Sequence, residues 1–198
     1  MANPGNDTRE RLINTAARLL WEQSYQGTSV DVLCSRTDIR KGSFYHFFKS
    51  KTELAIAAIE NSWGRTEQTV FAPIFGSTDG GMAQLQQLID KVDEIQSSIL
   101  QNRGIYPGCP FGSLGQEMAN KDEAIRASAL KIFQYHCDYI EAALRKAEAN
   151  GEIPPGDARQ RSRNIFALFE GALLIAKVAR NPALFRHVAA SVRSVAAA

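Results

Sequence analysis

Long apolar runs are absent from this 198-residue sequence. The most apolar stretch, residues 165–179, is interrupted by Glu170 and Lys177 and is too short for a comfortable membrane span. The segment 1–7 is polar and lacks the apolar core of an export signal. We therefore expect a cytoplasmic protein that does not enter a membrane.

Cysteine is also scarce. Cys34, Cys109 and Cys137 are an odd number without the spacing of a disulfide framework, so we expect free thiols in a reducing compartment. Cys34 is expected to pack inside a helix, and Cys137 beside His136 lacks further ligands at metal-binding spacing. Phosphate-binding loops, dinucleotide glycine patterns and zinc helix motifs are missing. The sequence thus predicts neither a cofactor nor a metal.

Strand-like alternation and internal repeats are missing as well, whereas helical periodicity recurs along the chain. With 44% hydrophobic and 22% charged residues, the chain can bury a substantial core. These features predict an all-α fold. The expected helices span about 8–26, 28–36, 40–47, 51 to beyond 63, 82–100, a short helix ending near 120, 122–150, 157–180 and 182–195.

Within residues 28–60 the pattern predicts a short helix, a tight turn, a second short helix and a long helix. Thr28 precedes Asp31 by three residues, the spacing of a helix cap and its reciprocal carboxylate. Asp38 falls where the chain must turn, and aspartate tolerates the left-handed backbone region. Ile39 is then expected to enter the core. In this prediction Gly27 closes the preceding helix.

The second short helix, residues 40–47, is too short to be stable alone, so tertiary packing must hold it. Phe44 and either Phe47 or Phe48 lie at helical spacing and are the expected anchors. The side chains left to face outward are Arg40, Ser43, Tyr45 and His46.

Positive charge is concentrated around this helix. Residues 36–51 contain five basic residues and one acidic residue, a net charge near +4, whereas the whole chain carries only +2. Such a cluster binds phosphates, and side chains that reach base edges add specificity. Ser50 as the cap of the long helix, followed by Lys51, offers a second phosphate site. The segment therefore indicates binding to double-stranded DNA.

The run Lys-Gly-Ser-Phe-Tyr-His-Phe-Phe-Lys-Ser-Lys, residues 41–51, resembles the recognition helix and following helix of the TetR family of transcriptional regulators. The resemblance covers roughly residues 8–63. Asp38 stands where the family commonly has glycine, and Arg40 replaces a small polar residue, which points to a distinctive operator. The resemblance implies a helix-turn-helix domain over 1–50 and a helical ligand-binding and dimerisation domain over 51–198.

The DNA-binding residues expected on this basis are Thr28, Ser29, Arg40, Lys41, Gly42, Ser43, Tyr45, His46, Lys49 and Lys51. In TetR-like proteins the last two helices pair with those of a second subunit, so the resemblance implies a homodimer on a palindromic operator. Phe166, Phe169, Leu173 and Leu174 are expected to point inward. Small residues such as Gly171 would let a partner helix approach.

A second segment of interest surrounds Cys109, where glycine and proline fix an irregular backbone over 108–112. A thiolate near a helix N-terminus is stabilised by the amide dipole. The segment is similar to a Gly-Cys loop in a TetR subgroup associated with electrophiles and unsaturated acids such as acrylate. The alternative is an inert buried thiol at a helix junction.

Lys177 is the cation within the apolar run near the C-terminus, and its expected partner is Glu170, a ligand anion or the Cys109 thiolate, unless it extends to solvent. Aromatic side chains are expected to wall a pocket between helices. The residues expected to sense a small-molecule effector are Cys109, Tyr106, Phe111, Glu117, Tyr135, Tyr139 and Lys177.

Three functions are compatible with these features. The favoured one is a transcriptional repressor, not an enzyme, that releases its operator on binding or reacting with a small molecule. A helical thiol enzyme with Cys109 as nucleophile, assisted by Lys177 or His136, would leave the basic segment unexplained. An architectural DNA-binding dimer would leave the second half of the chain without a role.

Overall fold

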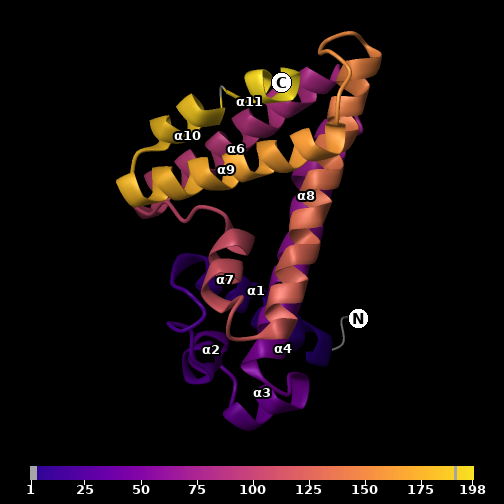
Figure 1. Ribbon diagram of the computed structural model, residues 1–198. Coiled ribbons are helices and arrows are strands. Elements are labelled where there is room, and N and C mark those ends of the chain that lie inside the picture. Colours follow the sequence, from indigo (N-terminus) through magenta and orange to yellow (C-terminus); the bar gives the residue numbers. More distant parts are fainter. Residues whose placement is uncertain (1–3, 190) are drawn as a thin grey trace. The chain divides into compact units, whose positions relative to one another are not determined.

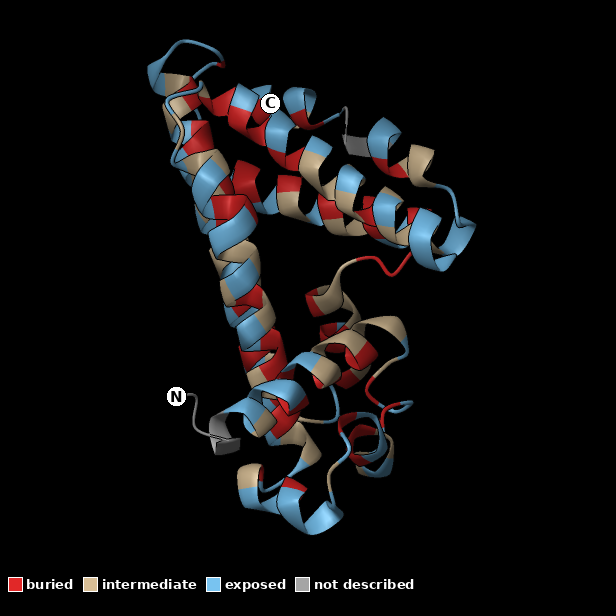
Figure 2. Ribbon diagram, turned by 180° about the vertical axis from the view of Figure 1, so that it is seen from behind, coloured by how far each residue is buried: buried red, intermediate tan, exposed pale blue. Residues whose placement is uncertain are grey.

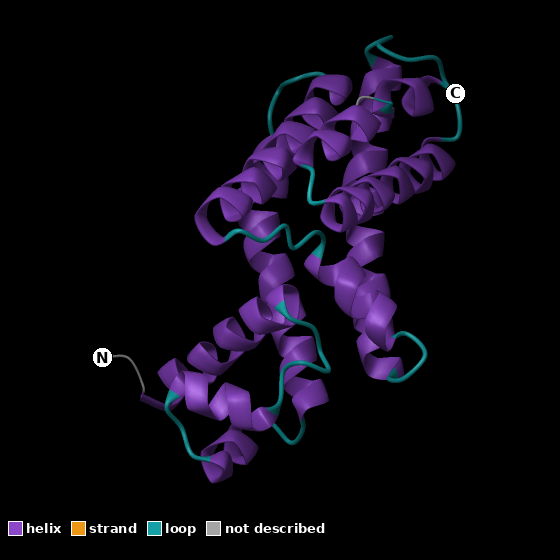
Figure 3. Cartoon of the chain, turned by 90° about the vertical axis from the view of Figure 1, so that its left-hand side faces the viewer, coloured by secondary structure: helices purple, strands orange, loops and turns teal. Residues whose placement is uncertain are grey.

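The computed structural model describes residues 4–189 and 191–198, and it confirms the predicted all-α fold, since the described residues form helices and loops without a strand (Figure 3). None of the helices in these ranges combines the length and apolar character needed to cross a membrane. The elements are α1 (Pro4–Glu22), α2 (Val30–Thr37), α3 (Lys41–Phe47), α4 (Lys51–Thr66), the π-helical turn η1 (Glu67–Phe71), α5 (Ala72–Phe75), α6 (Gly81–Arg103), α7 (Pro110–Met118), α8 (Glu123–Ala149), α9 (Ala158–Ala179), α10 (Pro182–Ala189) and α11 (Val192–Ala197), labelled in part in Figure 1.

Two compact units divide the chain. Unit 1 comprises Met1–Arg65 and Pro110–Ile132, and unit 2 comprises Thr66–Cys109 and Phe133–Ala198. The sequence suggested a boundary after residue 50, whereas unit 1 also includes most of α4, all of α7 and the start of α8. The polypeptide passes from unit 2 back to unit 1 between Cys109 and Pro110.

The core of unit 1 is built from the apolar faces that the helical periodicity predicted. Leucines and alanines of α1 and of α4 are buried, and the anchors of α3, Phe44 and Phe48, are 0% and 1% exposed. Phe47 and Ile39 are only partly buried, so Ile39 does not enter the core as fully as expected. The buried residues contributed by α1 and α4 are Leu12, Ile13, Ala16, Leu19, Leu20, Leu54, Ala55, Ala58 and Ile59.

The connection from α1 to α2 corrects the predicted boundaries. Helix α1 ends at Glu22 rather than near residue 26, so Gly27 does not close it. The cap of α2 is Ser29, whose hydroxyl accepts a hydrogen bond from the Val32 amide at 3.1 Å. Thr28, expected as the cap, donates instead to the Ser24 carbonyl at 2.8 Å and is fully buried. A buried hydroxyl needs an internal partner, and the preceding loop supplies it.

The turn between α2 and α3 is as the sequence indicated. Asp38 adopts the left-handed conformation, with φ 53° and ψ 50°. Its amide donates back to the Cys34 carbonyl and closes the end of α2. Cys34 is buried, as expected.

In unit 2, α9 packs against α10 and α11. Phe169 of α9 meets Phe185 of α10 edge to face, with ring centroids 5.8 Å apart. The sequence predicted a single helix over 182–195. This prediction is wrong, because the chain forms two short helices, α10 and α11, in this region. Leu174 was also expected to point inward, but it is 48% exposed.

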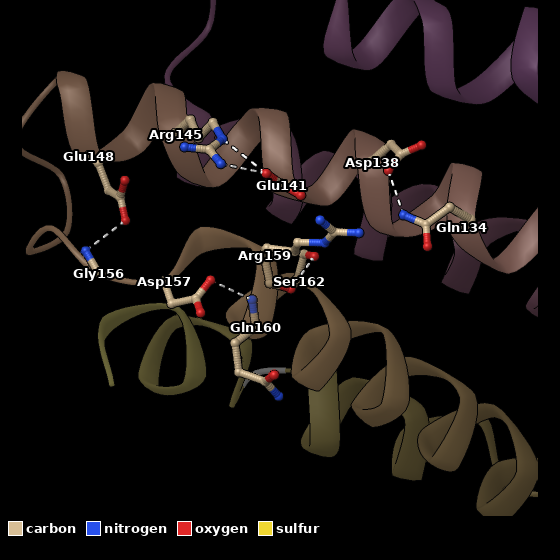
Figure 4. Close-up of polar contacts among 10 residues, drawn as sticks. All are labelled: Gln134, Asp138, Glu141, Arg145, Glu148, Gly156, Asp157, Arg159, Gln160 and Ser162. Atoms are coloured by element: carbon tan, nitrogen blue, oxygen red, sulfur yellow. Dashed lines mark hydrogen bonds and ion pairs between the residues drawn. The ribbon is translucent and has the colours of Figure 1, made fainter.

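The junction between α8 and α9 is fixed by polar contacts. The Glu148 carboxylate accepts a hydrogen bond from the Gly156 amide at 3.0 Å (Figure 4). It also accepts one from the buried Arg161 at 3.1 Å. Asp157 caps α9 by accepting from the Gln160 amide at 3.0 Å. A Cβ atom on Gly156 would collide with the Arg161 guanidinium, which would have to leave its bonds to Glu148 and to the Pro154 carbonyl.

Candidate functional site

Helix α3 presents a polar, solvent-exposed face. Its inner side is anchored by Phe44, and the remaining side chains that were expected to face outward do so, with Tyr45 52% exposed. In Figure 2 this short helix is mostly pale blue, the colour of exposed residues. Gly42 has open space around the position of a Cβ atom. The exposed residues on and beside α3 are Ser29, Arg40, Lys41, Gly42, Ser43, Tyr45, His46 and Lys49.

Lys41 lies in an ion pair with Asp31 of α2, with Nζ 2.8 Å from Oδ1. The hydrogen bond that the Lys41 ammonium donates to the Asp31 carboxylate raises the pKa of Lys41, and both side chains are exposed. An exposed pair of this kind contributes little to stability. Lys41 therefore remains cationic at the surface next to α3.

Lys51 has a different environment from the other basic residues. Its ammonium lies 3.9 Å from the centroid of the Tyr25 ring and donates to the Tyr25 carbonyl at 2.9 Å. Partial burial lowers the pKa of Lys51, and the nearby Glu117 carboxylate opposes that shift. In this structure Lys51 thus joins the start of α4 to the loop before α2. Thr28, being fully buried, likewise acts within the fold.

The start of α4 is capped by its own side chains. Ser50 accepts a hydrogen bond from the Glu53 amide at 3.1 Å, and Glu53 accepts from the Lys49 amide at 2.7 Å. This arrangement confirms Ser50 as the cap. The Lys49 amide, just before this helix start, is therefore already bonded to the Glu53 carboxylate.

Helix α7 is attached to the loop before α2 by the Glu117 carboxylate. Its two oxygens accept from the backbone amides of Tyr25 at 2.7 Å and Gln26 at 2.8 Å. The residue before them, Ser24, has a φ of 145°, which is unusual for a residue other than glycine. Glu117, expected at the effector site, therefore holds the loop that leads into α2.

Two further contacts reinforce this attachment. The Thr52 hydroxyl donates to Asp122 at 2.9 Å, and it lies 3.0 Å from the Tyr25 hydroxyl. Phe111, also expected at the effector site, packs edge to face against Trp63 of α4, with centroids 6.2 Å apart. The helix-turn-helix segment, the start of α4 and α7 thus share one core.

In unit 2 the loop before α7 is fixed at Gly108. The buried Gln96 side chain of α6 accepts from the Gly108 amide and donates to the Gly108 carbonyl, both at 3.1 Å. Gly108 has a φ of 71°, and a Cβ atom there would lie 3.3 Å from Cδ of Lys177. Gln96 was not among the residues predicted from the sequence. The signal that could have indicated it is an amide side chain on the apolar stripe of α6.

Cys109 follows this fixed glycine and contacts an acidic side chain. The Glu170 carboxyl accepts a hydrogen bond from the Cys109 thiol. Burial raises the pKa of Glu170, and the hydrogen bond from Cys109 partly offsets that rise. Cys109 is partly exposed, whereas Cys34 and Cys137 are buried and unbridged. Among the three thiols, Cys109 is therefore the most accessible.

Aromatic rings cluster between the π-helical turn and α8. Tyr139 donates to Glu67 at 3.0 Å, and its ring lies 5.2 Å from that of Phe71. Burial raises the pKa of Tyr139, and the bond to Glu67 adds to the rise. His136 lies 5.0 Å from Phe71 and 5.4 Å from Phe166. Of these residues, sequence reasoning selected Tyr139 and missed the ring contacts of His136.

Tyr106 is buried beside Asp93 of α6 and Arg186 of α10. Burial, followed by the Asp93 charge, raises the pKa of Tyr106 to about 12. The Tyr106 hydroxyl and one Asp93 oxygen are buried without a hydrogen-bond partner among the described residues. The other Asp93 oxygen lies 3.5 Å from Arg186. Tyr135, on α8, is partly buried.

A short exposed polar helix held by a helix-turn-helix head, together with a second helical unit, defines a DNA-binding regulator of the helix-turn-helix class. A model of bacterial regulatory proteins of the tetR family matches residues 12–58, and a model of the tetracyclin repressor-like C-terminal domain matches residues 81–192. The chain therefore belongs to the TetR family of transcriptional regulators. Ligand-responsive repression as a dimer is characteristic of this family.

Related proteins agree with this assignment. The chain is 30% identical to the uncharacterized regulator YxaF of Bacillus subtilis over 170 residues, 85% of this chain and 84% of the relative. It is 25% identical to the repressor NemR of Escherichia coli over 198 residues, 97% and 95% of the two chains.

Solved structures show the same fold. A TetR-family regulator from Agrobacterium tumefaciens matches with a TM-score of 0.85 at 20% identity and covers 98% of this chain and 100% of its own. The reduced form of E. coli NemR matches with a TM-score of 0.81 at 23% identity, covering 96% and 97% of the chains.

Glu117→Ala should destabilise unit 1, because it leaves two amides of the loop before α2 without their acceptor. Hydrogen bonds to a charged group contribute about 1.5–3 kcal/mol each. Since the bond from Gln26 is exposed to solvent and contributes little, we expect a total loss of about 1.5–3 kcal/mol in chemical denaturation. Operator affinity should fall as well. Glu123→Ala, which removes an exposed carboxylate paired with Arg126, is the control and should change neither quantity appreciably. Equal behaviour of the two variants would contradict the role of Glu117.

Proposed function

We propose that this chain is a cytoplasmic homodimeric repressor that binds a palindromic operator through α3 and releases it when a small electrophile or unsaturated acid occupies the site at Cys109. The observation that carries the effector half of this proposal is the Cys109 thiol, which is partly exposed and hydrogen-bonded to the partly buried Glu170. The DNA-binding half is supported by the exposed polar face of α3 and by membership of the family.

The proposed contacts to bases and to phosphates are assigned to exposed side chains on and beside α3. Arg40 and Ser43 approach base edges, and Tyr45 and Lys49 contact phosphates, because all four side chains are exposed around α3. Lys51 belongs to this group only if DNA draws its ammonium away from Tyr25. Two such helices, about one DNA turn apart, require a dimer.

The proposed dimer surface is an apolar stripe on α9. Leu174, Ile175 and Val178 are 48%, 50% and 77% exposed, which is unusual for large apolar side chains so close together. With Leu168 and Gly171 they follow spacings of three and four residues, the period of a helix-helix seam. A second copy of α9, together with α10 and α11, would cover this stripe.

The proposed release depends on a difference in affinity. To change operator occupancy from 99:1 to 1:99, an effector must favour the released form by about 5.5 kcal/mol. A covalent adduct on Cys109, or a buried carboxylate paired with Lys177, is strong enough for this. Because the chain continues directly from Cys109 into α7, displacement of the loop would reach Glu117 and the loop before α2.

Arg40→Ala should reduce discrimination between bases at one operator position, at a cost of about 1–3 kcal/mol if the guanidinium grips a guanine. Lys49→Ala should instead weaken binding to operator and random DNA alike and lower the salt dependence by about one ion. Fluorescence anisotropy titrations with both DNAs at several salt concentrations would measure this. An equal loss on both DNAs for Arg40→Ala would exclude base reading.

Gly171→Leu should weaken the dimer. The space around its Cβ position is open within the subunit, so the added side chain would meet only a partner helix. Overpacking a seam costs about 1–3 kcal/mol, which raises the dimer dissociation constant about 5- to 150-fold. Gly64→Leu, also in open helical surroundings, is the matched control. Sedimentation as an unperturbed dimer with unchanged operator affinity would place Gly171 outside the interface.

Cys109→Ser should retain operator affinity but no longer respond to electrophiles in a gel-shift release assay. Lys177→Met should weaken the response, because the lysine side chain lies next to the Gly108–Cys109 loop. If Cys109→Ser still responds to a small unsaturated acid while Lys177→Met does not, the effector binds without a covalent bond. Retention of every response by both variants would remove this site from consideration.

A further inference from the structure

A partly buried carboxyl group, that of Glu170, is hydrogen-bonded to the thiol of Cys109. Glu170 is on α9, one turn after Phe166 and two turns before Lys177, so these three side chains share a face of the helix. The Phe166 ring packs against Phe133 and His136 with centroids 5.1 Å and 5.4 Å away. Glu170 is therefore placed where aromatic rings, a cation and a nucleophile meet.

The loop that carries Cys109 is held in one position from the opposite side. Gln96 of α6 binds both the amide and the carbonyl of Gly108, and the positive φ of Gly108 would strain any other residue at this position. The thiol is consequently presented to Glu170 by a fixed backbone. Such pre-positioning is what a proton transfer between two side chains needs.

We propose that Glu170 is the proton-transfer partner of Cys109 when its thiol adds to an α,β-unsaturated carbonyl compound. This proposal rests on the proposed function and identifies the residue that makes the thiol reactive. Glu170 accepts the thiol hydrogen bond in the resting structure, so it is the group already aligned with the proton that must leave sulfur.

The reaction balances with the groups present. The thiol proton passes to the Glu170 carboxylate, and the sulfur forms a bond to the β-carbon as the C=C π electrons move toward the carbonyl oxygen. The Glu170 carboxylic acid then returns its proton to the α-carbon. The net change is addition of S–H across the double bond, with no oxidant or reductant required.

The physical reason for choosing Glu170 is its environment. A carboxyl group at its ordinary pKa is a weak base for a thiol, and burial brings the carboxyl pKa closer to that of the thiol. Lys177 supplies positive charge that would attract the carbonyl oxygen or a carboxylate of the electrophile. Glu170 thus transfers the proton, and Lys177 stabilises the negative charge.

The test compares two reagents on purified full-length protein. Methyl vinyl ketone requires both removal of the thiol proton and return of a proton to carbon, whereas iodoacetamide requires only the first step, since iodide leaves. Adduct formation at Cys109 is followed by mass spectrometry of the Cys109 peptide, which separates it from Cys34 and Cys137. Glu170→Gln, close in shape but unable to transfer the proton, should slow both reactions.

The ratio of the rate with methyl vinyl ketone to the rate with iodoacetamide tests the proposed role of Glu170. In Glu170→Gln the rate with methyl vinyl ketone should fall about 10-fold more than the rate with iodoacetamide. Glu170→Asp, which keeps a carboxyl group, should restore most of the ratio and also serves if the glutamine variant folds poorly. Glu141→Gln, which removes a carboxylate paired with Arg145 on α8 (Figure 4), should leave both rates unchanged. Equal slowing with both reagents, or no slowing, would overturn the assignment.

Failure of the proposed function would look different. If the wild-type protein forms the Cys109 adduct but keeps its operator, the effector half of the proposed function fails while the role of Glu170 stands. If release occurs normally but the rate ratio does not depend on residue 170, the role of Glu170 fails alone. Lack of any reaction at Cys109 would overturn the role of Glu170 and the covalent form of the proposed function, while release by a small unsaturated acid would leave its non-covalent form standing.

Discussion

A helix of seven residues cannot hold its shape in water by itself, and the exposed polar helix α3 has this length. Its geometry depends on two buried rings, Phe44 and Phe48, which fix it to the core of unit 1. That core also includes α7 and the start of α8, which are distant from α3 in the sequence. The consequence is that α7 belongs to the same unit as α3.

Under the proposed function, this sharing gives the loop that carries Cys109 a covalent route to DNA binding. Gly108 and Cys109 are held by Gln96 and Glu170 in unit 2, and the next residue, Pro110, begins α7 in unit 1. Under the proposed function, an adduct that displaces the loop acts on α7 directly through the chain. The Glu117 carboxylate would then transmit that displacement to the loop before α2.

Two partly buried carboxyl groups, Glu148 and Glu170, have different roles. Glu148 joins α8 to α9 through the two hydrogen bonds that its Oε1 accepts, so it has a structural role. Glu170 has a raised pKa and a reactive neighbour, a combination typical of functional sites. Because the folded protein disfavours the charged form of this carboxyl group, the free energy of unfolding falls as the pH rises through its pKa. A residue with a purely structural role would have no advantage that offsets this loss of stability.

The amino-acid sequence by itself determined the all-α fold, the outward face of α3, the left-handed turn at Asp38 and the family, because these depend on periodicity, local backbone preference and a continuous motif. It also selected Cys109. Only the tertiary structure decided that Thr28 is buried, that Glu117 and Phe111 pack in unit 1, and that Glu170 and Gln96 flank the Cys109 loop. These positions join residues 12 to 92 apart in sequence, and a hydrogen-bond partner at that distance leaves no periodic signal in the chain.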